Sequence, residues 1–186
     1  MYLIKTEFVK LRRCNILWVG IITLLCAPLL SILQQQSLND PVDNYGYVNL
    51  VNGTIWNNMS FFLPVTLMLL GGYMISREYT DDTLKEIFII PLSYSKLMAG
   101  KIGALLILSV FYSFYSFVLT TGLSILFYPI GLTGIAIIKA LLQICGMGLC
   151  ICISIMPFIC WSGSAKNRFW VGTVLVFVYG ILGIPL

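Results

Sequence analysis

Few side chains in this 186-residue sequence can do chemistry, and most of those that can are charged. The chain contains no histidine, which removes the commonest general base and the commonest neutral metal ligand. Its six cysteines, at positions 14, 26, 145, 150, 152 and 160, lie within or at the ends of apolar runs. We therefore expect no disulfide framework, no metal site, no catalytic residue and no cofactor.

An enzyme acting inside a membrane is the one catalytic class that needs a closer look. Lys139, Cys150 and Cys152 are its only reactive candidates, and no acid or base accompanies them in any apolar run. General acid–base chemistry requires such a partner. We predict that the chain is not an enzyme. Substrate-binding residues are not identifiable, because aromatic side chains such as Tyr112 and Tyr115 fit helix packing at least as well as a cargo site.

The charged residues concentrate in one stretch, residues 77–101, which predicts a short helix at about 82–90. Asp81 or Asp82 can cap its start, and Pro91 follows its end. Leu84, Ile87 and Phe88 share one side of this helix at i, i+3, i+4 spacing, away from the charged residues. Such a helix either rests in the membrane interface or docks into a groove of a soluble partner.

Residues 2–13 predict a second amphipathic helix, lying along the membrane surface. Its two faces are an apolar one (Leu3, Ile4, Phe8 and Leu11) and a basic one (Lys5, Lys10, Arg12 and Arg13). Glu7 interrupts the apolar face. This carboxylate is either a tolerated interfacial charge or a contact with a partner.

Long apolar runs adjoin these two predicted helices in the sequence. The chain is 59% hydrophobic and 10% charged, with a mean hydropathy of +0.96, too apolar for a soluble globule. We predict an all-α integral membrane protein, a single domain over residues 1–186. Its five spans should cover about 15–33, 59–76, 102–127, 135–161 and 169–186. Glycines at 71, 72, 146 and 148 are expected to permit close helix packing.

Basic residues set the predicted orientation. Ten of the eleven lysines and arginines flank the runs on one side, and Lys139 alone lies on the other. Polar residues 34–57 contain two aspartates and no basic residue, which predicts an outside loop. We expect a multi-pass protein of the cell membrane with a cytoplasmic amino terminus. The net charge of +4 therefore reflects topology and not nucleic-acid binding.

Two segments resemble ABC-2 type exporter permeases. Glu78-x4-Thr83-Leu84-Lys85-x5-Pro91-Leu92-Ser93, followed by Lys96 and Gly100-Lys101, is similar to the family's cytoplasmic loop. Asp82 stands where that loop usually has glycine. Glu7-x2-Lys10-x-Arg12-Arg13 resembles the family's interfacial elbow helix. Within the family, the closest resemblance is to permeases of bacitracin-resistance and lantibiotic-immunity transporters.

The resemblance implies a partner and a cargo. The chain has no G-x-x-x-x-G-K-[ST] motif, so ATP hydrolysis would belong to a separate ATP-binding-cassette subunit. Two permease copies, in a homo- or heterodimer, would export a peptide antibiotic or remove it from the membrane. The elbow helix at 2–13 and a coupling helix at 82–90 would contact the ATPase. The implied contacts are Glu7, Glu78, Asp82, Thr83, Lys85 and Glu86.

The number of spans and the lack of a substrate signature keep an alternative open. Family members normally have six spans, so the resemblance implies a chain that lacks the sixth. A membrane scaffold or immunity protein without an ATPase partner, which does not transport, would also fit an amphipathic lipid-embedded chain. Copurification of an ATP-hydrolysing subunit separates the two hypotheses.

Overall fold

The computed structural model describes residues 16–37, 46–80, 94–127, 130–162 and 169–182, and over these the chain is helical with no strand. The elements are the α-helices α2 (Ile16–Ser37), α3 (Tyr47–Asn57), α4 (Leu63–Thr80), α6 (Tyr94–Phe127), α7 (Gly134–Ser162) and α8 (Phe169–Leu182), with a π-helix, η2 (Asn58–Phe62), between α3 and α4. The prediction of an all-α protein is confirmed.

Four spans within the described residues are long and apolar enough to cross a membrane, and they are Leu17–Gln36, Tyr47–Ile75, Met98–Phe127 and Gly134–Trp161. Helix α8 lies where the fifth span is predicted, but its 14 residues fall short of the roughly 20 that cross the hydrocarbon. The fifth span therefore stays a prediction. The amphipathic helices expected at 2–13 and 82–90 lie outside the described residues.

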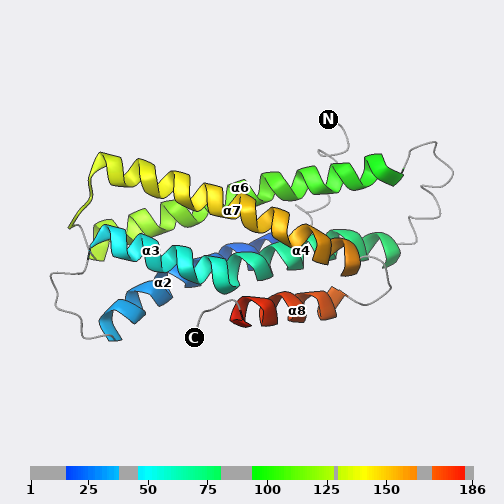
Figure 1. Cartoon of the computed structure of the whole chain (residues 1–186), viewed down its shortest axis with the longest axis horizontal. Helices are drawn as coiled ribbons and strands as arrows, with labels where there is room; N and C mark the ends of the chain where they lie inside the picture. Colours follow the sequence, from blue (N-terminus) through cyan, green and yellow to red (C-terminus); the bar gives the residue numbers. More distant parts are fainter. Residues whose placement is uncertain (1–15, 38–45, 81–93, 128–129, 163–168, 183–186) are drawn as a thin grey trace.

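The helices form one elongated bundle (Figure 1). In this view α6 and α7 lie together on one side of α4, and α8 lies on the other side. Helices α3, η2 and α4 follow one another without a break. The main core joins side chains from five helices, including Leu24 of α2, Leu67 of α4, Leu108 of α6, Ile155 of α7 and Val176 of α8.

The prediction that residues 34–57 form a loop is wrong at both ends. Helix α2 continues to Ser37, and α3 begins at Tyr47. Two of the polar residues that suggested a loop, Thr54 and Asn57, are buried between the two helices and have hydrogen-bond partners. The Asn57 amide nitrogen lies 3.0 Å from the Ser31 hydroxyl and 3.3 Å from Gln34 Oε1. Buried polar groups that have hydrogen-bond partners are compatible with a membrane helix.

Glycines allow the closest helix contacts. A Cβ at Gly148 of α7 would overlap the Ser113 hydroxyl of α6, and a Cβ at Gly71 would come within 2.7 Å of Ile159. Gly146, two residues from Gly148, has open space around it. The close-packing prediction is therefore confirmed at Gly71 and Gly148 and wrong at Gly146. Helical geometry explains the difference, because residues two apart face nearly opposite directions.

Candidate functional site

The six residues predicted to contact an ATPase are not brought together by the described part of the chain. Glu7, Asp82, Thr83, Lys85 and Glu86 lie outside it. Glu78 lies in the last turn of α4, with its side chain also outside the description. Helix α4 ends and α6 begins at the same end of the bundle (Figure 1). The predicted coupling segment therefore connects two helix ends that are neighbours in space.

A buried lysine joins these two helices close to that end. Lys101 of α6 is 3% exposed, and its ammonium group donates a hydrogen bond to the Met74 carbonyl of α4 at 3.0 Å. A hydrogen bond from a charged donor contributes about 1.5–3 kcal/mol. Lys101, which the sequence analysis counted among the inside-facing basic residues, thus links two membrane helices by a buried hydrogen bond. The available signal was its place directly before the predicted span 102–127.

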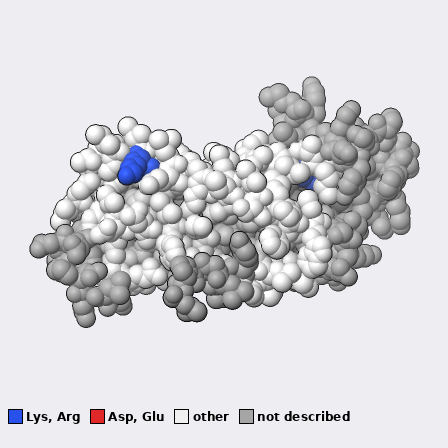
Figure 2. Space-filling view, viewed as in Figure 1, with Lys and Arg blue, Asp and Glu red and all other residues white. Residues whose placement is uncertain are grey.

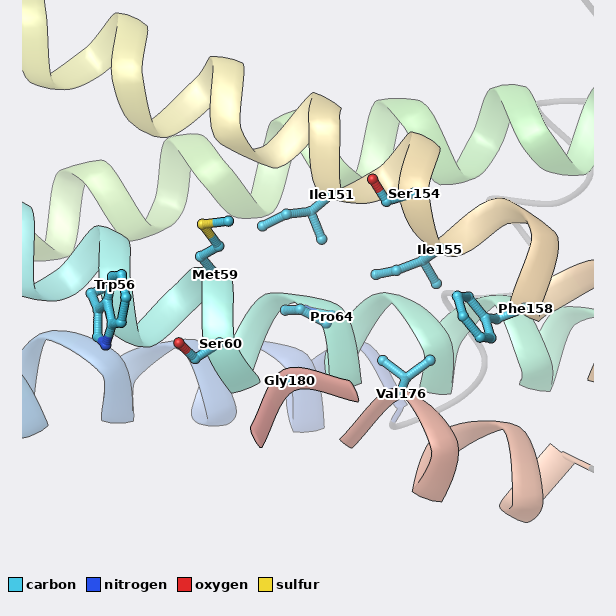
Figure 3. Close-up of a pocket in the computed structure, with 10 residues that line it drawn as sticks. All are labelled: Trp56, Met59, Ser60, Pro64, Ile151, Ser154, Ile155, Phe158, Val176 and Gly180. Atoms are coloured by element: carbon cyan, nitrogen blue, oxygen red, sulfur yellow. The ribbon is translucent and has the colours of Figure 1, made fainter. Parts of the chain in front are cut away.

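A mostly apolar cavity of about 370 Å³ lies between α4, α7 and α8. Figure 3 shows its ten lining residues, which come from α3, η2, α4, α7 and α8. Trp56, Met59, Ser60 and Pro64 form one wall, Ile151, Ser154, Ile155 and Phe158 form the second, and Val176 and Gly180 form the third. Its size and lining are those of a site for a small or chain-like apolar ligand.

A second hollow, of about 490 Å³, continues this cavity toward the start of α7. The two share Met59, Ile151 and Ser154. The second hollow adds the amides of Asn52 and Gln143. Together they form one groove, here named the α7 groove, that is apolar at one end and carries uncharged hydrogen-bonding groups at the other.

A proline explains the shape of the groove wall. Pro64 has no N–H group, so it cannot supply the α-helical donor to the Ser60 carbonyl. Just before it the helix widens into η2, where the Leu63 N–H bonds to the Asn58 carbonyl five residues back. π-Helices are frequently found at functional sites. Gly180 of α8 packs so closely on this wall that a Cβ there would overlap the Ser60 carbonyl oxygen.

The adjoining face of α7, around Gly148, has a different character. Small polar side chains of α6 are fully buried along a stripe that faces α7 and η2, comprising Ser109, Ser113, Ser116, Thr120 and Ser124. The Ser109 hydroxyl donates to the Gly148 carbonyl at 2.7 Å, and Asn58 Nδ2 donates to the Ser116 hydroxyl at 2.7 Å. This stripe, here named the polar seam, holds the helices together and leaves no room for a ligand at Gly148.

No group of three histidine, cysteine or acidic side chains that could hold a metal occurs in the part of the chain that the structure describes. The cysteines described there are free thiols, with Cys150 exposed and Cys152 buried.

The model of the ABC-2 family transporter proteins matches residues 3–183, nearly the whole chain. The chain belongs to the ABC-2 family. The comparison confirms the resemblance seen in the charged segments and identifies the bundle as a multi-pass membrane protein of transporter type. None of the curated proteins and none of the solved structures compared with this ABC-2 protein matches it.

Proposed function

We propose that this ABC-2 protein is the permease subunit of an ATP-driven exporter whose ATPase is a separate chain. The observation that carries the proposal is the family match over residues 3–183. Permeases of this family generally work with an ATPase subunit. The sequence contains no Walker-type phosphate loop, so the energy for transport must come from elsewhere.

The geometry of α4 and α6 supports a route for that energy. A push on the segment between these helices acts on two helix ends at once, and the Lys101–Met74 hydrogen bond makes the pair move as a unit. Closure of the ATPase would then rock the membrane helices between two states as a rigid body. Glu7, Glu78, Asp82, Thr83, Lys85 and Glu86 are the proposed contacts. The permease works as a homo- or heterodimer, with its amino terminus in the cytoplasm.

A peptide antibiotic of the bacitracin or lantibiotic type is the proposed cargo. The support is the resemblance of the two charged segments to permeases that handle such peptides, together with the many large apolar side chains exposed on the described helices. An amphipathic peptide reaches such a surface through the membrane.

The test is a charge exchange in the coupling segment. We expect Lys85→Glu with Glu86→Lys to abolish bacitracin or lantibiotic resistance and ATPase copurification, because the ion-pairing pattern is inverted while net charge is kept. Asp43→Asn, in a different segment, is the control and should retain both. Membrane fractionation verifies insertion of each variant. Full resistance in the exchanged variant would contradict the coupling role, and resistance without any ATP-hydrolysing partner would favour the scaffold.

A further inference from the structure

The α7 groove continues into a line of residues that reaches a positive charge. Lys139, Gln143, Met147, Ile151 and Ser154 follow one another on α7 at intervals of three or four residues, which places them on one face. The last four line the groove. Lys139 is exposed one turn before Gln143. The face therefore runs from a cation through uncharged amides to an apolar cavity.

A basic side chain lies at the matching end of the bundle. Figure 2 shows basic atoms over the end where α7 begins. Among the residues that the structure describes at that end, Lys139 is exposed. An anionic group is favoured at this point, close to the interface, where a lysine extends its ammonium group toward water.

We propose that the α7 groove binds one bilayer phospholipid, with its phosphate at Lys139 and one acyl chain in the cavity. The amides of Asn52 and Gln143 can donate hydrogen bonds to the ester carbonyls that lie between those two parts. None of the residues that line the groove is charged. A buried ionic group would find no partner there, whereas an acyl chain needs none.

The dimensions fit one chain. Helix α7 rises roughly 22 Å between Gln143 and Phe158 at about 1.5 Å per residue. One leaflet contributes about 15 Å of hydrocarbon. The groove is therefore long enough for the full depth of a leaflet. This inference does not depend on the transport proposal, because a structural lipid requires no ATPase.

Photo-crosslinking in vesicles tests the proposal. The full chain is reconstituted in phosphatidylethanolamine vesicles containing phosphatidylglycerol with a diazirine on one acyl chain, and the crosslinked peptides are mapped by mass spectrometry. We expect crosslinks at Met59, Ile155 and Phe158 to exceed those at the outward-facing Leu142 and Ile153. Ser154→Phe fills the groove and should lower groove crosslinking about tenfold, since added bulk in an occupied site disfavours binding. Ile153→Phe is the matched control and should not change it.

Two substitutions of Lys139 test the proposed contact with the lipid phosphate. Lys139→Gln should lower groove crosslinking several-fold, and Lys139→Arg should retain it, because only the charge is required. Crosslinks spread equally over the outward-facing residues and unchanged by Ser154→Phe would overturn the proposal. Displacement of the label from the groove by bacitracin would also overturn it, because the groove would then be a cargo site. If the unaltered chain shows groove labelling but confers no antibiotic resistance, the transport proposal alone would be contradicted.

Discussion

The two long faces of α7 differ in how their neighbours approach. On one face Gly148 and the polar seam bring α6 into backbone contact, with the Ser109 hydroxyl bonded to the Gly148 carbonyl. On the adjoining face larger apolar residues such as Ile151 and Phe158 line a groove. A membrane offers little hydrophobic force between helices, so residue size and hydrogen bonding decide where they close. A single helix can therefore serve as a fixed support on one side and as a binding wall on the other.

The closed face is most sensitive at its tightest point. We expect Gly148→Ala to lower the free energy of unfolding by about 2 kcal/mol, because the new methyl group would overlap the Ser113 hydroxyl. SDS titration in mixed micelles measures this change. Gly146→Ala is the control, and with open space around it should be neutral or stabilise by up to about 1 kcal/mol. Equal losses at both positions would show that the close contact with Ser113 does not explain the loss at Gly148.

The groove face has one tight point, where α8 meets η2. Gly180→Ala should lower stability by about 1 kcal/mol or more, since the added carbon would overlap the Ser60 carbonyl. The short helix α8 can shift outward, so we expect a smaller loss than at Gly148. Gly134→Ala, in open surroundings, is its control. A larger loss at Gly180 than at Gly148 would show that α8 is held more rigidly than α6.

The polar seam should respond weakly to loss of one hydrogen bond. Ser116→Ala removes the acceptor of the Asn58 amide and should cost about 0.6 kcal/mol, the average for such bonds in membranes. Thr23→Ala is the control, because the Thr23 hydroxyl is exposed and bonds only within its own helix in the contacts seen. The same micelle titration compares the two. If Ser116→Ala leaves the free energy of unfolding unchanged, residue size alone would account for the close helix packing on that face.

The sequence predicts the apolar helices well, because long hydrophobic runs leave few alternatives. It fails at residues 47–57, where Asn57 and Thr54 suggest a loop but are satisfied by Ser31 across the helix pair. Pattern alone also cannot separate Gly146 from Gly148, since their difference lies in which neighbour each faces. The groove depends on the meeting of Pro64, Gly180 and α7, which are distant in sequence. The proposed ATPase contacts remain predictions.

The same substitution made at Ser109 of α6, which packs on α7, and at Ser154 of α7 tests the account most directly. Ser109 belongs to the polar seam and is fully buried, whereas Ser154 lines the groove and is exposed. We predict that Ser109→Phe lowers the free energy of unfolding by about 3 kcal/mol, and that Ser154→Phe changes it by less than about 0.5 kcal/mol. Equal losses for the two phenylalanine variants would contradict the description of α7 as a helix with one closed and one open face.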